Sequence, residues 1–200
     1  PERLELAPLG VERGRFFPVP GTTSLEGDPA LLSLGSLVPV KGHSILVEAF
    51  SRVASRRTGA VLHVVGEGPE RSAIEALARA RGLGDRVRLH GAVPHDALPP
   101  LYRGAHLFVL SSRFESQCLA ALEALACGTP VAGTAVGILP EIVPASLLAA
   151  PGDPAALAKA IEAALSLDAE ERGRLGIFPD RLSLSATVAR WRELYDRLRA

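Results

Sequence analysis

Apolar residues in this chain occur alternately as short runs and at helical spacing. From Ala30 onward, short apolar runs predict strands at 31–37, 61–65, 87–89, 106–110, 131–134 and 147–149. Apolar residues that recur every three or four positions predict helices at 45–54, 74–82, 119–126, 154–165, 169–175 and 184–198. Short strands that alternate with helices are typical of βαβ units, which build parallel sheets covered by helices on both faces.

The order of these elements predicts an α/β fold with a Rossmann-like, doubly wound parallel sheet of about six strands. Residues 1–29 do not follow the alternation and are rich in Pro, Gly and charge, so we interpret them as a linker or the edge of a missing N-terminal domain. Residues 30–182 are the predicted Rossmann-like domain, and residues 183–200 are a predicted C-terminal helix. Ligands of such sheets bind beyond the carboxyl ends of the strands, so the residues that follow each strand are the first candidates.

Composition excludes several classes of protein. The chain has 200 residues, of which 48% are apolar, so it is large enough to bury a core. Its 22 basic and 22 acidic residues balance, and we therefore expect no nucleic-acid partner. The apolar runs are too short for a transmembrane segment and no signal peptide is visible, so we expect a cytoplasmic protein. Because the chain begins at Pro1 and contains no Met, we also expect it to be a fragment or a processed product.

The cysteines and histidines predict neither a metal site nor a cofactor. Cys118 and Cys127 are nine positions apart, a spacing that is typical of neither a redox pair nor a zinc site, so we interpret them as small buried residues. The five histidines are scattered singly, and no pair has the spacing of metal ligands. We expect them to be structural residues with satisfied hydrogen bonds.

Two loops that follow predicted strands contain candidate ligand-binding residues. The first, Gly35 to Gly42, is a glycine-bounded turn that leads into a helix, where free backbone N–H groups can bind an anion and Lys41 adds a positive charge. Its spacing is not that of a Walker motif, and a solvated lysine is the alternative interpretation. In the second loop, Gly66 and Gly68 either allow a ligand to approach closely or simply form the turn.

The loop and helix after the fourth strand contain two carboxylates eight positions apart, Glu115 and Glu123. Between Cys118 and Cys127 the predicted helix is entirely Ala and Leu except for Glu123, and a helix that is apolar all round is a buried one. Burying a carboxylate there costs several kcal/mol, roughly, unless it is paired or faces a polar cleft. We expect both carboxylates to line one pocket, with the helix N-terminus directed at an anion; a structural ion pair between Glu123 and an arginine is the alternative.

Taken in order, these loops resemble the C-terminal domain of the retaining glycosyltransferase family 4, also called group 1. The resemblance covers essentially the whole chain and rests on an ordered set of segments rather than on one motif. The similar segments are Pro8–Val11 with Phe16–Pro18, Val38–Gly42, Val64–Pro69, Leu89–Pro94, Glu115 with Glu123 (the EX7E motif), Ala126–Val131, Pro140–Val143 and Pro151–Pro154.

This resemblance implies one half of a GT-B fold and an activity. Such an enzyme transfers a sugar from a UDP-, GDP- or ADP-sugar to an acceptor with retention of anomeric configuration, by same-face displacement and without a divalent metal. The resemblance also implies an N-terminal acceptor-binding domain of the same enzyme, through which any peripheral contact with a membrane would be made. The fragment alone is expected to be inactive.

The resemblance further implies roles for individual residues. Lys41 would contact the donor diphosphate, with the loop of Gly66 and Gly68 nearby. Glu115 would contact the transferred sugar, and Glu123 would bind the ribose hydroxyls. Backbone groups would make the remaining contacts. Those of Cys118 and Leu119 would bind sugar or phosphate oxygens, and that of Val93 would contact the base edge.

The chain departs from the family pattern at three places. Ser36 stands where the family usually has Arg, and Glu115-Ser116-Gln117-Cys118 stands where it usually has Glu-Gly-Phe-Gly. Ile138 and Leu139 follow Gly137 where the family usually has a second Gly. Two alternatives therefore stay open, a diverged nucleotide-sugar-binding module without catalysis and a nucleotide-sugar epimerase of similar shape.

Overall fold

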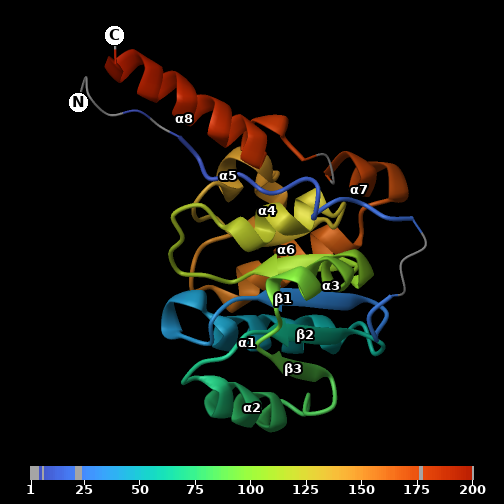
Figure 1. The fold of residues 1–200 in the computed structure, drawn as a ribbon. Coiled ribbons are helices and arrows are strands. Elements are labelled where there is room, and N and C mark those ends of the chain that lie inside the picture. Colours follow the sequence, from blue (N-terminus) through green and yellow to red (C-terminus); the bar gives the residue numbers. More distant parts are fainter. Residues whose placement is uncertain (1–4, 6, 21–23, 176–177, 200) are drawn as a thin grey trace.

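The computed structural model describes residues 5, 7–20, 24–175 and 178–199, and it confirms the predicted parallel sheet (Figure 1). Six strands lie in the order β3-β2-β1-β4-β5-β6, and every neighbouring pair is parallel. The strands are β1 (Ala30–Leu34), β2 (Val61–Val65), β3 (Val87–Gly91), β4 (Leu107–Leu110), β5 (Val131–Thr134) and β6 (Leu148–Ala149). From β1 the chain thus adds β2 and β3 on one side. It then returns to the other side of β1, where it adds β4, β5 and β6 in turn.

Helices cover both faces of the sheet. On one face α1 (His43–Ala54) packs against α2 (Arg71–Ala80) and α6 (Pro154–Leu165). On the other face α3 (Leu98–Gly104) packs against β1 and α4, while α4 (Leu119–Ala126) packs on β4 and β5. The apolar strand residues are buried because both faces are covered, as in other doubly wound sheets. The remaining helices are α5 (Leu139–Ile142), α7 (Ala169–Leu175) and α8 (Leu184–Arg199).

The structure corrects two details of the predicted elements. The first strand ends at Leu34 rather than at Leu37, because the Leu37 N–H turns away to donate to the carbonyl oxygen of Glu67 at 2.9 Å. Helix α3 was not predicted, since it has only seven residues and two prolines in its first turn. Proline is tolerated there because the first N–H groups of a helix have no partner within the helix.

The N-terminal segment packs against the start of α8. Val11 pairs with Ser183 in a parallel bridge, and the Val11 N–H donates to the carbonyl oxygen of Leu182 at 2.9 Å. Phe16 is buried and contacts the ring of Tyr102 edge-on. In Figure 1 this segment (blue) passes beside α8 (red). The domain boundaries at residues 29 and 182 stay predictions.

Among the residues that the structure describes, no helix combines the length and the apolar character needed to cross a bilayer.

Two histidines are paired where β2 lies beside β3. His63 Nε2 lies 2.8 Å from the carbonyl oxygen of Glu26, which can only accept, so this nitrogen carries a proton. In the tautomer with its proton on Nε2, His63 presents Nδ1 as an acceptor, and His90 Nε2 donates to it at 2.9 Å. Burial lowers the pKa of His90, and electrostatic interactions with His63 and Arg88 lower it further.

This pair predicts a loss of stability at mildly acidic pH. In the folded chain His90 stays neutral to a lower pH than in the unfolded chain, where its pKa is close to 6.5. The unfolded state therefore takes up more protons as the pH falls, and the stabilisation present above that value is lost. Between about pH 7.5 and about pH 5.5 the free energy of unfolding, measured by urea denaturation, should fall more in wild type than in His90→Gln. Equal decreases in the two proteins would contradict this account.

Candidate functional site

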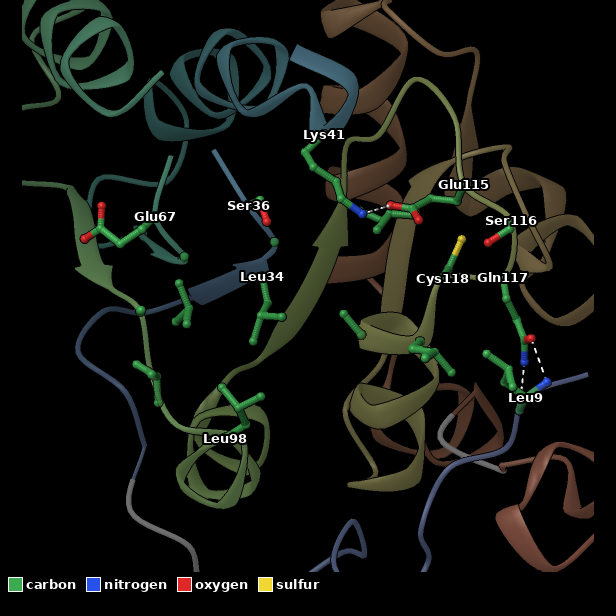
Figure 2. Close-up of a pocket in the computed structure, with 18 residues that line it drawn as sticks. Leu9, Leu34, Ser36, Lys41, Glu67, Leu98, Glu115, Ser116, Gln117 and Cys118 are labelled. Carbon is green, nitrogen blue, oxygen red and sulfur yellow. Dashed lines mark hydrogen bonds and ion pairs between the residues drawn. The ribbon is translucent and has the colours of Figure 1, made fainter. Parts of the chain in front are cut away.

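A cavity of about 620 Å³ opens at the carboxyl edge of the sheet, where β1 and β4 lie side by side. The loops after these two strands lead in opposite directions, which is the usual ligand position in a doubly wound sheet. Figure 2 shows the residues around it. The lining consists of Leu9, Leu34, Gly35, Ser36, Lys41, Val65, Gly66, Glu67, Ala92, Val93, Leu98, Leu110, Glu115, Ser116, Gln117, Cys118, Leu119 and Ala120.

The two loops that diverge at this edge are bonded to each other. The Arg113 N–H donates to the carbonyl oxygen of Val40 at 2.7 Å, and Ser111 Oγ donates to that of Lys41 at 2.9 Å. Gly42 has φ of 64° and its missing side chain leaves room for this approach, because a Cβ atom would lie 2.3 Å from the Ser111 carbonyl oxygen. The loop that carries Lys41 is therefore fixed to the loop that carries Glu115.

Lys41 and Glu115 form an ion pair inside the cavity (Figure 2). Lys41 Nζ donates to Glu115 Oε1 at 2.6 Å, and Ser112 Oγ donates to the same oxygen at 2.7 Å. The Lys41 side chain is 29% exposed and that of Glu115 is 13% exposed, so both charges are reachable from the cavity but poorly solvated. The structure thus brings together the expected cation and one of the two expected carboxylates.

The two glycines after β2 differ in their positions. Gly66 lines the cavity, and a Cβ atom there would lie 2.0 Å from the carbonyl oxygen of Gly35, so the turn after β1 requires this glycine. Gly68 does not line the cavity. A Cβ atom on Gly68 would lie 2.5 Å from the carbonyl oxygen of Leu37, which indicates packing of one loop on the other. Val93, expected near the base of a ligand, also lines the cavity.

Helix α4 begins at the cavity with Cys118 as its N-cap residue. Cys118 is the one non-glycine residue with positive φ, 68°, in the part of the chain that the structure describes. Burial raises the pKa of its thiol to about 12, and the Glu115 carboxylate contributes to this rise. Burial likewise raises the pKa of Cys127 to about 11. Both thiols are buried, as predicted, and stay protonated at neutral pH, which does not favour a role as nucleophile.

Glu123 does not line this cavity, which corrects the expectation that both carboxylates line one pocket. It lies one helical turn beyond Leu119 and Ala120, which do line the cavity, and so follows them on the same face of α4. Its Oε1 lies 2.9 Å from His95 Nε2, and its Oε2 accepts from the Tyr102 hydroxyl at 2.8 Å. The partners are therefore a histidine and a tyrosine, not the arginine considered as an alternative.

The hydrogen bonds around Glu123 fix the protonation of its partners. Arg15 Nη1 lies 3.0 Å from His95 Nδ1, and because a guanidinium can only donate, Nδ1 accepts. The proton of His95 then resides on Nε2 and is donated to Glu123. Burial raises the pKa of Tyr102 well above 10, and the Glu123 charge raises it further, so the phenol keeps its proton. Both carboxylate oxygens of Glu123 therefore have a fixed donor, and each retains a free lone pair.

His43, the first residue of α1, departs from the expectation of satisfied histidines. It is 2% exposed, and neither ring nitrogen has a hydrogen-bond partner. Burial lowers its pKa, while the neighbouring backbone of Gly35 and Ser36 raises it and the charge of Lys41 lowers it again. Among the described residues, no group of three or more His, Cys, Asp or Glu side chains is arranged to hold a metal ion.

Part of the lining was expected from the sequence and part was not. Gly35 and Ser36 belong to the candidate loop after the first strand, and Glu67 lies between the candidate glycines Gly66 and Gly68. Leu98 belongs to the unpredicted helix α3, and Leu9 lies in the N-terminal segment, more than 100 residues from the loop it contacts. No local pattern in the sequence signals these two residues.

The fold and the cavity are those of a Rossmann-like ligand-binding domain, and comparisons with known proteins identify GT-B glycosyltransferases as similar. Residues 20–177 match the family Glycosyl transferases group 1. A 2-deoxystreptamine N-acetyl-D-glucosaminyltransferase from Streptomyces fradiae is 40% identical over 149 residues, which are 72% of this chain and 35% of that protein. Among solved structures, sucrose-phosphate synthase from Thermosynechococcus elongatus has a TM-score of 0.81 at 32% identity, over 97% of this chain and 52% of the other.

A second structure shows the same fold at lower identity. Alr3699/HepE from Anabaena in complex with UDP-glucose has a TM-score of 0.81 at 20% identity, over 94% of this chain and 56% of the other. The chain belongs to the glycosyl transferases group 1 family. It spans between 33% and 49% of the length of the first curated relatives that it matches.

The contacts of Glu123 predict that the Tyr102 hydroxyl stabilises the fold. Tyr102→Phe removes only that hydroxyl and leaves a carboxylate that is 12% exposed without one of its donors. We expect the free energy of unfolding, measured by urea denaturation, to decrease by about 1–3 kcal/mol. Tyr195, the only other tyrosine, is 60% exposed, so Tyr195→Phe is a matched control with little effect. Similar costs for the two substitutions would show that the buried hydroxyl does not stabilise the carboxylate.

Proposed function

We propose that this chain is the donor-binding domain of a retaining glycosyltransferase, which binds a nucleoside diphosphate sugar for transfer to an acceptor. The observation that carries the proposal is the position of Lys41, in the cavity at the divergence of the loops after β1 and β4. Family membership supports the class of reaction, and UDP-glucose bound to the Anabaena protein of the same fold supports the class of ligand.

The diphosphate is proposed to bind between Lys41 and the N-terminus of α4. Cys118, Leu119 and Ala120 line the cavity, so the first turn of α4 contributes the positive end of its dipole and its backbone N–H groups. Lys41 contributes a full positive charge on the other side. Together they would stabilise the negative charge that develops on the leaving diphosphate, so we propose a reaction that needs no divalent metal.

Glu115 is proposed to contact the transferred sugar rather than to attack it. Its Oε1 accepts from both Lys41 and Ser112, so much of the carboxylate charge is already neutralised. In the same-face displacement that we propose, no carboxylate attacks the sugar, so Glu115 needs only to bind it. A diphosphate that binds Lys41 would also compete with Glu115 for it and leave the carboxylate free to accept from sugar hydroxyls.

The nucleoside is proposed to lie at the other end of the cavity, toward Val93 and Glu123. Val93 lines the cavity through the loop after β3, two positions before His95, which bonds Glu123. Because Glu123 follows Leu119 by one turn of α4 and is bonded to His95, we propose that its free lone pairs lie next to this end of the cavity. Ribose hydroxyls that reach it would meet a carboxylate already oriented by His95 and Tyr102. The backbone of Val93 is proposed to contact the base.

The acceptor site is proposed to belong to an N-terminal domain of the same enzyme. The curated relatives are two to three times longer than the part matched by this chain. Helix α8 carries large exposed apolar side chains at intervals of three and four positions, which form one stripe of the helix. Such a stripe normally packs against another surface, and we propose that it packs against that domain. The stripe consists of Leu184, Val188, Trp191, Tyr195 and Leu198.

We predict that replacing Lys41 selectively weakens the binding of phosphate groups. Lys41→Met keeps the length of the side chain and removes its charge, so affinity for UDP, GDP or ADP should fall by about 10-fold or more, while affinity for the nucleoside should change little. Isothermal titration calorimetry on the chain measures both. Lys159, the only other lysine, is exposed on α6, and Lys159→Met is the matched control.

Two results would contradict the proposal. Equal losses for nucleoside and diphosphate in Lys41→Met would show that the lysine does not contact phosphate. Absence of binding for all three diphosphates and their sugars would show that the cavity is not a donor site. A turnover assay on the complete polypeptide then distinguishes a transferase from a binding module or an epimerase.

A further inference from the structure

The Gln117 side chain is bonded to the backbone of a distant segment. Its Oε1 accepts from the Leu9 N–H at 2.8 Å, and its Nε2 donates to the Leu9 carbonyl oxygen. Figure 2 shows both bonds at the end of the cavity that contains Glu115 and Cys118. A side-chain amide that satisfies both peptide groups of one residue acts as a neighbouring strand would. We call this pair of bonds the Gln117 clasp.

The neighbours of Leu9 are held by the start of α8, whereas the peptide groups of Leu9 itself are bonded by Gln117. The Pro8 carbonyl oxygen accepts from Thr187 Oγ1 on α8 at 2.7 Å. The Val11 carbonyl oxygen accepts from the Leu184 N–H at 2.9 Å. Gly10 lies so close to Ser183 that a Cβ atom would be 2.1 Å from its carbonyl oxygen. Residues 8–11 are thus fixed to the start of α8 on one side, and the two hydrogen bonds of Gln117 connect them to the loop of residues 115–118.

The clasp places an apolar side chain in the cavity. Leu9 is 54% exposed yet lines the cavity, beside Ser116 and Gln117. Glu115, which is bonded to Lys41, belongs to the same loop. In the proposed orientation of the donor, this is the end at which the sugar lies, so Leu9 would contact the sugar and not the nucleoside.

We propose that Gln117 is a specificity-determining residue, which positions Leu9 as the wall of the sugar end of the donor cavity. Its side-chain amide is bonded to both peptide groups of Leu9, so the proposed effect of Gln117 on the ligand is through Leu9. The sugar part of this inference depends on the proposed function, whereas the clasp does not. Gln117 stands where the family pattern usually has Phe, and its bonds to Leu9 use an amide that Phe lacks.

The experiment measures the clasp and the ligand separately. Hydrogen exchange of the Leu9 amide, followed residue by residue by NMR, reports on the clasp. We expect exchange to become about fivefold to tenfold faster in Gln117→Met, which has a similar length and no amide, because the hydrogen bond of the Leu9 N–H is lost. Gln117→Asn keeps the amide but is one methylene shorter, so it should resemble Gln117→Met. The Val11 amide, bonded to Leu182, is the internal control and should keep its exchange rate, which also shows that both variants fold.

Calorimetric titration of the same variants tests the specificity. UDP and UDP-glucose serve as probes, and the corresponding GDP or ADP pair replaces them if it binds wild type more tightly. We expect the affinity of Gln117→Met for the nucleotide sugar to fall about fivefold, which is the scale of one lost apolar contact, and its affinity for the free diphosphate to stay within about twofold.

Each result is decisive. Unchanged exchange of the Leu9 amide in Gln117→Met overturns the clasp, whatever the nucleotides do. Faster exchange with equal losses for diphosphate and nucleotide sugar, or with no loss, overturns the role in specificity and leaves the clasp established. A wild-type chain that binds none of these ligands overturns the proposed function together with the specificity, and the exchange measurement still decides the clasp.

Discussion

The bond between Lys41 and Glu115 is the interaction on which the candidate site depends. It forms because parallel strands β1 and β4 are neighbours, so that the loops after them start side by side and then diverge. Backbone bonds between the two loops fix the distance, and glycine at position 42 permits the approach. The pair keeps a cation and an anion at the ligand edge of the sheet without leaving either charge unbalanced. A bound diphosphate would replace Glu115 as the partner of Lys41.

A second buried acid is stabilised in a different way. Glu123 lies on a helix that is otherwise apolar, and its carboxylate is held by two donors, His95 from the segment after β3 and Tyr102 from α3. Arg15 fixes the proton of His95, so a residue of the N-terminal segment contributes to the orientation of a carboxylate more than 100 positions away. Leu9 of the same segment lines the cavity through Gln117. This segment is therefore part of the site and not only a connection.

The sequence predicts the fold well because strands buried on both faces appear as uninterrupted apolar runs. Lys41, Gly66 and Glu115 could be expected at the cavity because each follows a strand closely in the sequence. Glu123 was noticed because an acid in an apolar helix is costly, but cost alone does not identify the partner, and its real partners come from a loop and from the unpredicted helix α3. The contact between Gln117 and Leu9 was not predictable, since neither residue belongs to a periodic element and 108 positions separate them.

The most direct test of this account is a crystal structure of the chain with a bound nucleoside diphosphate. We expect the ligand to occupy the cavity between β1 and β4, with its phosphate oxygens at the N-terminus of α4 and within hydrogen-bond distance of Lys41, which has left Glu115. A ligand bound elsewhere, or a ligand in the cavity with Lys41 still bonded to Glu115, would contradict it.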